Sequence, residues 1–215
     1  MPRHRTSTLS RPRLLNRLHG AIGNGLTVIQ APPGFGKTSL AAEFAQDVDF
    51  AVSWVSLDSS CAVPEVFARQ VSASLMGEAY RYEPSAVSRA GDLKAYLGAA
   101  LAQSVSCEQP RLLVLDNLEH LGSDEVTVDL LGWLIEVAPE GFEILLCGRA
   151  LPPLTGLDQR IASGDVALLG SAELAFNREE ITLAAVRVHS TIPTETVLST
   201  TDGWPVGVMA VLSGT

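Results

Sequence analysis

The feature that most constrains this chain is the octet Ala-Pro-Pro-Gly-Phe-Gly-Lys-Thr at residues 31–38. It follows the pattern G-x-x-x-x-G-K-[ST], which forms a loop around phosphate groups, with Ala31 in place of the first glycine. An apolar run typical of a strand precedes the octet at residues 26–30, and a run typical of a helix follows it at 39–45. Because a phosphate-binding loop joins a strand to a helix, this setting favours a true nucleotide site over a chance match.

The residue types in the loop suit a dense negative charge. Gly34 and Gly36 allow the backbone to bend so that successive N–H groups point inward, and the helix that follows adds the positive end of its dipole. Lys37 is expected to place its ammonium group on the β- and γ-phosphates, and Thr38 to offer its hydroxyl to Mg²⁺. The residues expected to contact nucleotide from this loop are Pro33, Gly34, Phe35, Gly36, Lys37, Thr38 and Ser39.

The metal side of the site is expected where the buried run at residues 112–115 ends. Asp116 closes that run, and its carboxylate is predicted to hold Mg²⁺ together with Thr38. The alternative for Asp116 is a strand-end residue that makes a turn or caps a helix. Arg149 follows another buried run, and its guanidinium is a candidate sensor of the γ-phosphate. The alternative is an ordinary surface arginine.

The residue after the metal carboxylate is Asn117, where many ATPases of this kind carry a second acid that polarises the attacking water. An amide cannot accept a proton, so Asn117 predicts slow hydrolysis. Glu119 is a possible substitute, but its direction does not follow from the sequence. The predicted catalytic residues are therefore Lys37, Asp116, Asn117 and Arg149.

Charge and composition exclude several classes of protein. Apolar residues make up 47% of the 215 residues, which is enough for a full core. The 15 basic and 24 acidic residues leave a net charge of −9, which argues against direct nucleic-acid binding by this segment. Arg11, Arg13 and Arg17 belong to a basic N-terminal cluster that we interpret as a solvated tail.

The cysteines and the apolar runs place the chain in a reducing, aqueous environment. Cys61, Cys107 and Cys147 show neither metal-ligand spacing nor a disulfide framework, and Cys147 is expected in the core. No apolar run is long enough to cross a bilayer, and the polar N-terminus does not resemble a signal peptide. We therefore expect a cytoplasmic protein with no membrane partner.

Periodicity predicts strands that alternate with helices, and thus a parallel sheet with right-handed crossovers. The expected strands are 26–30, 51–57, 112–115, 143–147 and 166–169. The expected helices are 14–18, 39–45, 64–75, 93–104, 123–137, 177–188, 195–201 and 205–212, with a loop at 80–91. Three parts follow: an arm with a short helix at 1–24, a nucleotide-binding domain at 25–170, and a helical lid at 171–215.

Some residues at the helix ends carry specific expectations. Ser123 is predicted as an N-cap, and Asn177 as another that forms a capping box with Glu180. Trp204 is expected as a core aromatic residue. Pro205 suits the first position of the last helix, and a proline in that turn could press against an adenine ring.

Taken together, these segments resemble the ATPase domain of the STAND class (signal-transduction ATPases with numerous domains). The nearest resemblance is to the large LuxR-type and maltose-activator-type bacterial transcription regulators. The segments that carry it are 11–18, 31–40, 53–58, 112–121, 145–154, 173–181 and 203–214.

The resemblance implies a five-stranded, AAA+-like parallel sheet with a small helical lid. It also implies that Arg149 acts as the sensor arginine, that Pro205 lies beside adenine, and that the stretch beginning at Arg11 contacts the nucleotide near the base. The family normally continues into winged-helix, helical-repeat sensor and DNA-binding domains, so we read the chain as the fragment of a longer regulator.

These observations predict a slowly hydrolysing module that binds ATP and ADP with Mg²⁺ and controls transcription through domains not present here. ADP is expected to hold a closed, inactive form, whereas ATP together with an inducer sensed elsewhere is expected to favour an open form that self-associates. One alternative is a stand-alone enzyme with the same loop, such as a small-molecule kinase, although no cluster for an acceptor site is visible. Another is a scaffold that binds no nucleotide, against which the intact Gly36-Lys37-Thr38 argues.

Overall fold

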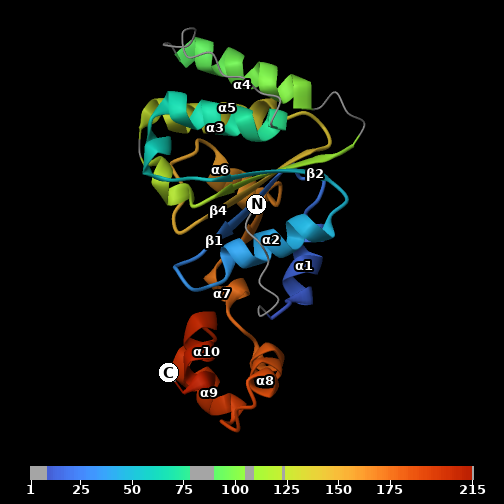
Figure 1. The fold of residues 1–215 in the computed structure, drawn as a ribbon, viewed down its shortest axis with the longest axis vertical. Coiled ribbons are helices and arrows are strands. Elements are labelled where there is room, and N and C mark those ends of the chain that lie inside the picture. The colour runs from blue at the N-terminus through green and yellow to red at the C-terminus, as the bar shows by residue number, and fades with distance from the viewer. Residues whose placement is uncertain (1–8, 78–89, 105–108, 123, 215) are drawn as a thin grey trace.

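The centre of the molecule is a sheet of five parallel strands in the order β2-β3-β4-β1-β5 (Figure 1). The computed structural model describes residues 9–77, 90–104, 109–122 and 124–214. The strands are β1 (Leu26–Gln30), β2 (Ala51–Ser56), β3 (Arg111–Asp116), β4 (Phe142–Gly148) and β5 (Ala167–Leu169). This confirms the expected fold class, an α/β domain with a five-stranded parallel sheet and a separate group of helices at the C-terminal end.

Helices cover both faces of the sheet (Figure 1). One face carries α3 (Pro64–Met76), α4 (Ala90–Ser104), α5 (Glu125–Val137) and α6 (Leu157–Ser163). The other carries α1 (Pro12–His19), α2 (Lys37–Asp47) and α7 (Ser171–Leu174). Short 3₁₀ turns η1 (Ser59–Ala62) and η4 (Leu118–Leu121) follow β2 and β3.

The two inner strands β3 and β4 divide their side chains between these layers. In β3, Leu113 and Leu115 pack under α3 to α5, whereas Leu112 and Val114 pack toward α1 and α2. Successive side chains of a strand point to opposite faces, and here both faces are covered. This explains why the sequence shows a continuous apolar run at this strand and not an alternating one.

The last three helices form a unit with its own small core, which we call the lid. They are α8 (Arg178–Arg187), α9 (Thr194–Thr201) and α10 (Pro205–Ser213). Ile181, Val197 and Val208 are fully buried in this core, whereas Leu174 of α7 packs with the sheet. The lid lies beyond α7 and α1 and makes the narrow end of the molecule (Figure 1).

The capping box of α8 is confirmed. The Asn177 side chain accepts a hydrogen bond from the Glu180 amide (2.8 Å), and the Glu180 carboxylate accepts one from the Asn177 amide (3.0 Å). The predicted cap of α5 is wrong: Asp124 is the N-cap, since its carboxylate accepts from the Thr127 amide (3.0 Å). The helix α5 begins at Glu125, two residues after the start of the expected range, and Ser123 itself lies outside the described residues.

Three other expectations are corrected. Arg11 is buried and paired, so this part of the basic cluster is not a solvated tail. Trp204 is 42% exposed and is not a core residue. Of the loop predicted at 80–91, residues 80–89 lie outside the described part, and Gly91 lies inside α4.

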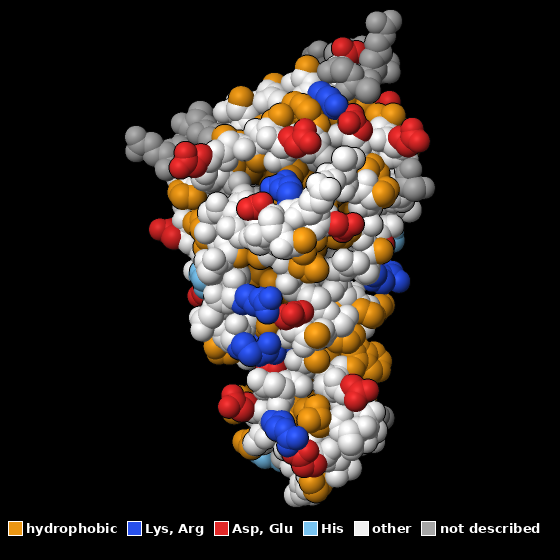
Figure 2. Space-filling view, turned by 180° about the vertical axis from the view of Figure 1, so that it is seen from behind, with side chains coloured by type: hydrophobic (Ala, Val, Ile, Leu, Met, Phe, Trp, Pro, Cys, Tyr) orange, Lys and Arg blue, Asp and Glu red, His pale blue; other side chains and the backbone are white. Residues whose placement is uncertain are grey.

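Cys61 and Cys147 are buried free thiols, and Cys107 lies outside the described residues. None of the described helices combines the length and apolar character that a bilayer span requires. On the face drawn in Figure 2, basic side chains occur singly or in pairs among acidic and apolar ones.

Candidate nucleotide-binding site

The loop between β1 and α2 takes its shape from two glycines. Gly34 has φ 84° and Gly36, the N-cap of α2, has φ 78°. Both values lie in the left-handed region, which glycine adopts without a steric penalty. Ala31 occupies the position of the first glycine in the pattern and does not have a positive φ. It is buried, and its amide donates a hydrogen bond to the Gly148 carbonyl oxygen (3.2 Å). Alanine is therefore compatible with the loop at that position.

Lys37 folds back over the loop that carries it. Its ammonium group donates hydrogen bonds to the carbonyl oxygens of Ala31 (2.7 Å) and Pro32 (3.1 Å). Burial lowers the pKa of Lys37, although the nearby carboxylates of Glu119 and Asp116 oppose the change. These two hydrogen bonds hold the ammonium group against the loop.

Asp116 and Thr38 meet at the carboxyl end of the sheet. The Thr38 hydroxyl donates to the two carboxylate oxygens of Asp116 at 2.9 and 3.2 Å. Burial raises the pKa of Asp116, and the hydrogen bond from Thr38 opposes that shift. One hydroxyl and one carboxylate are a donor set that fits Mg²⁺, which usually takes few protein ligands and completes its shell with water and phosphate. Among the described residues, no cluster of three or more ligating side chains suits another metal.

Asn117 has a conformational role that the sequence did not reveal. Its backbone is left-handed (φ 64°, ψ 46°) at the start of η4, a conformation that asparagine tolerates better than most residues. Its amide N–H donates to Asp116 Oδ1 (3.0 Å), which helps to orient the carboxylate. The turn at Asn117 also sets the direction of the residues that follow, including Glu119.

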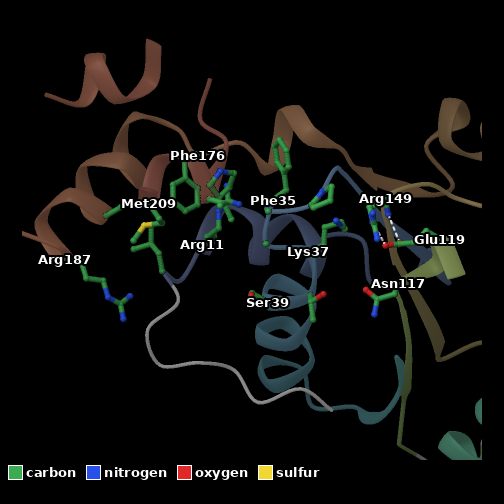
Figure 3. A pocket seen from close by; sticks show the side chains of 18 residues that line it. Arg11, Phe35, Lys37, Ser39, Asn117, Glu119, Arg149, Phe176, Arg187 and Met209 are labelled. Carbon is green, nitrogen blue, oxygen red and sulfur yellow. Dashed lines mark hydrogen bonds and ion pairs between the residues drawn. The ribbon is translucent and has the colours of Figure 1, made fainter. Parts of the chain in front are cut away.

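Glu119 faces the site but is engaged by Arg149. Its Oε1 accepts a hydrogen bond from Arg149 Nε at 2.6 Å, and its Oε2 accepts one from the Arg149 amide at 3.0 Å. Burial raises the pKa of Glu119, but the hydrogen bonds and charge of Arg149 outweigh it and lower the pKa overall. The two side chains form the ion pair that is drawn at one end of the pocket in Figure 3.

The loop, the strand ends, the N-terminal arm and the lid enclose one cleft of about 810 Å³ (Figure 3). Its lining includes these residues predicted from the sequence: Arg11, Pro33, Gly34, Phe35, Gly36, Lys37, Thr38, Ser39, Asn117, Arg149 and Pro205. Asp116 is not part of the lining and is reached through Thr38. Residues from both ends of the chain therefore meet at one place, although their individual roles stay predictions.

Sequence reasoning missed the apolar end of this cleft. Leu9 from the arm and residues of the lid line it, with Phe176, Met209 and Arg187 drawn at the end away from Lys37 (Figure 3). The missed lining residues are Leu9, Phe176, Ala184, Arg187, Val206 and Met209. In the sequence, the apolar ones are indistinguishable from the core positions of short helices.

Arg11 lies in the lining, but its guanidinium is engaged by protein groups. It forms two hydrogen bonds with the Glu180 carboxylate (3.0 and 3.1 Å) and two with the carbonyls of Leu174 and Ala175 (2.8 and 3.1 Å). It also stacks over the Phe176 ring at 4.8 Å from the centroid. Arg11 thus joins the N-terminal arm to the lid beside the cleft.

Comparison with known proteins identifies the family of the domain that carries this cleft. The family model described as an AAA domain matches residues 21–150, from the end of the arm to just beyond Arg149. The chain belongs to the AAA domain family. It is therefore a P-loop ATPase domain, and membership of this family implies nucleotide binding, typically with Mg²⁺.

The AAA domain also has curated relatives among transcription regulators. It is 31% identical over 179 residues to the HTH-type transcriptional regulator MalT of Yersinia enterocolitica, and 30% identical to that of Serratia proteamaculans. Each match covers 81% of this chain and 20% of the relative. The chain thus spans about a fifth of the length of these relatives.

Solved structures show the same fold. A STAND protein with a tetratricopeptide repeat sensor from Pyrococcus horikoshii has a TM-score of 0.61 at 18% identity, over 98% of this chain and 30% of that one. A Walker-type ATPase of Pyrococcus abyssi has a TM-score of 0.59 at 14% identity, over 100% and 71% of the two chains. The expected resemblance to STAND ATPases and MalT-type regulators is confirmed.

Proposed function

We propose that this AAA domain is a nucleotide-dependent switch that binds ADP and ATP with Mg²⁺, hydrolyses ATP slowly, and controls transcription through other domains. The observation that carries the proposal is that the phosphate-binding loop, Arg149, the arm and the lid all line the same cleft. A ligand in that cleft contacts the sheet domain and the lid together, so its binding depends on their relative position.

The phosphate end of the cleft supplies the groups for the polyphosphate. Backbone N–H groups of the loop and the N-terminus of α2 would bind the phosphates, and Lys37 would exchange its bonds to Ala31 and Pro32 for bonds to phosphate oxygens. Thr38 and Asp116 would hold Mg²⁺, which neutralises phosphate charge when bound. The apolar end, with Leu9 and Pro205, would receive the base.

Discrimination between ADP and ATP requires a group that responds to one additional phosphoryl group. Arg149 is suited to this role because its guanidinium already binds a carboxylate, Glu119, and can exchange it for a phosphate oxygen. A ligand shifts a conformational equilibrium only through such differential contacts. We infer that ADP leaves the Arg149–Glu119 pair intact and stabilises a closed form, whereas ATP breaks it and favours an open, self-associating form.

The same pair supports slow hydrolysis. Asn117 cannot act as a base, and Glu119, whose carboxylate lines the cleft, has a lowered pKa and both oxygens engaged by Arg149. A weakly basic, engaged carboxylate is a poor acceptor for the proton of an attacking water.

The test starts from protein stripped of nucleotide and titrated calorimetrically with ADP or ATP in the presence of Mg²⁺. We expect both to bind and Lys37→Ala to weaken binding about 10- to 100-fold, since charge-assisted hydrogen bonds are lost. Lys94→Ala is the matched control, because Lys94 pairs with Asp129 on the far side of the sheet. Absence of binding to the wild-type protein would overturn the proposal.

Turnover separates the switch from a small-molecule kinase. We expect phosphate release well below roughly 1 s⁻¹, the low end of ordinary enzymes, and no transfer of phosphate to small acceptors. Sedimentation with ADP and with a non-hydrolysable ATP analogue tests self-association. Rapid turnover without a partner, or transfer to an acceptor, contradicts the switch.

A further inference from the structure

Trp204 contacts the phosphate-binding loop, although it is a lid residue. It is the N-cap of α10, and its indole N–H donates a hydrogen bond to the Pro33 carbonyl oxygen (3.1 Å). Two residues later, the Val206 amide donates to the Gly34 carbonyl oxygen (3.2 Å). The lid is thus hydrogen-bonded to two consecutive peptide units of the loop that is expected to hold phosphate.

The Val206 bond satisfies a donor that the helix itself leaves open. Val206 is the second residue of α10, and the first N–H groups of a helix have no partner within it. Pro205, at the first position, has no N–H to satisfy. The Gly34 carbonyl therefore completes the N-terminus of α10, and separation of the lid from the loop would expose the Val206 amide to water.

Three glycines leave space for this contact. A Cβ on Gly34 would lie 2.7 Å from the Trp204 indole nitrogen, and a Cβ on Gly207 would lie 2.7 Å from Cε3 of the same ring. A Cβ on Gly203 would lie 2.5 Å from the Phe176 carbonyl oxygen. Gly34 thus serves the close approach of the lid in addition to the turn of the loop. In the segment Gly-Trp-Pro-Val-Gly at 203–207, the absence of a side chain at Gly207 allows the indole ring of Trp204 to pack against the loop.

The lid has a second attachment of a different kind. Arg11 and Glu180 form a buried ion pair that joins it to the N-terminal arm, and the side chains of both are 8% exposed. In contrast, Trp204 is 42% exposed, and the lid is bonded to the loop by only two neutral hydrogen bonds among the described residues, one from the Trp204 indole and one from the Val206 amide. Buried charge-assisted bonds are stronger than exposed neutral ones, so the loop contact is the one that can open while the arm contact persists.

We propose that Trp204 is a positioning residue that latches the lid to the phosphate-binding loop, so that phosphate bound by the loop tightens the closed form. In a trans peptide unit the C=O and N–H groups point in opposite directions. An anion held by the N–H groups at 34 and 35 polarises the carbonyls of residues 33 and 34, which become better acceptors for the lid. The coupling to nucleotide rests on the proposed function, whereas the latch itself does not.

The test compares Trp204→Phe with Trp54→Phe in the 215-residue chain. Each variant loses one indole hydrogen bond, but Trp54 donates to Ser56 on the edge strand β2, away from the lid. In nucleotide-free protein, we expect hydrogen exchange of the Val206 amide to rise about two- to tenfold in Trp204→Phe only, the effect of one neutral hydrogen bond. Release of a fluorescent ADP analogue should accelerate by a similar factor in the same variant.

A second variant keeps the test decisive if Trp204→Phe lowers the yield of folded protein. Gly207→Ala adds a methyl group that displaces the indole ring, while alanine favours the helix that contains it. It should therefore raise Val206 exchange without destabilising α10. Unchanged Val206 exchange in both lid variants, or an equal increase in Trp54→Phe, overturns the latch. If ADP binds to none of the proteins, the proposed function fails, and the exchange measurement still decides the latch.

Discussion

The sheet domain and the lid are stabilised in different ways. The sheet buries Leu113 and Val114 on opposite faces of one strand, between two layers of helices. The lid has a small core, against which Leu9 of the arm packs, and polar contacts at Arg11 and Trp204 also join it to the rest of the molecule. Apolar burial on two faces makes a scaffold that unfolds as a unit, whereas a few polar bonds permit an element to move. The cleft lies between the two parts, where such movement can affect binding.

The largest expected effect is in the sheet. Leu113→Ala should lower the free energy of unfolding by about 3 kcal/mol, because it leaves a cavity in the core that the surrounding side chains fill only in part. Denaturant unfolding followed by far-UV circular dichroism measures it.

Ile181→Ala is the matched change in the lid, since Ile181 is equally buried there. We expect it to increase hydrogen exchange in α8 to α10 while the main unfolding transition stays near that of the wild type. If both variants shift the same transition equally, the lid and the sheet form one cooperative unit and the comparison fails.

An intermediate effect is expected where the lid meets the arm. Glu180→Gln leaves the buried Arg11 guanidinium without a charged partner and should weaken the attachment of the lid by about 2 kcal/mol. Limited proteolysis and hydrogen exchange of α8 measure the loss. Glu179→Gln, at an exposed neighbouring position, is the control and should behave like the wild type.

The smallest expected effect is a pH dependence of the same contact. Burial raises the pKa of Glu180, but hydrogen bonds from Arg11 and the Asn177 amide outweigh it and lower the pKa below the ordinary value of 4.5. Because the pKa of Glu180 is lowered in the folded state, the ionised carboxylate stabilises the attachment of the lid fully above pH 4.5. This stabilisation is lost as the pH falls further. Exchange of α8 amides, corrected for intrinsic rates, should therefore rise below that pH, and Glu180→Gln should flatten the response.

Much of the site was predictable because its chemistry is local in sequence. The loop at 33–39 is contiguous, and Asp116 was identifiable because it ends a run that is buried on both faces. The pairing of Glu119 with Arg149 was not predictable, since these residues meet only when β3 and β4 lie side by side. The burial of Trp204 was predicted wrongly because tryptophan is an apolar residue type that usually packs in a core. In the structure its ring lies close to Gly34 and Gly207, and it is 42% exposed.

The sequence by itself determined the class of fold and the position of the phosphate site, because strand periodicity and the glycine–lysine–threonine pattern act over a few neighbouring residues. The tertiary structure decided which groups face that site from a distance. Arg11, Glu180 and Trp204 are between 24 and 193 residues apart along the chain, and their roles come from the folding of both chain ends over one edge of the sheet. Contacts between such distant segments depend on the packing of the whole molecule, which no local pattern encodes.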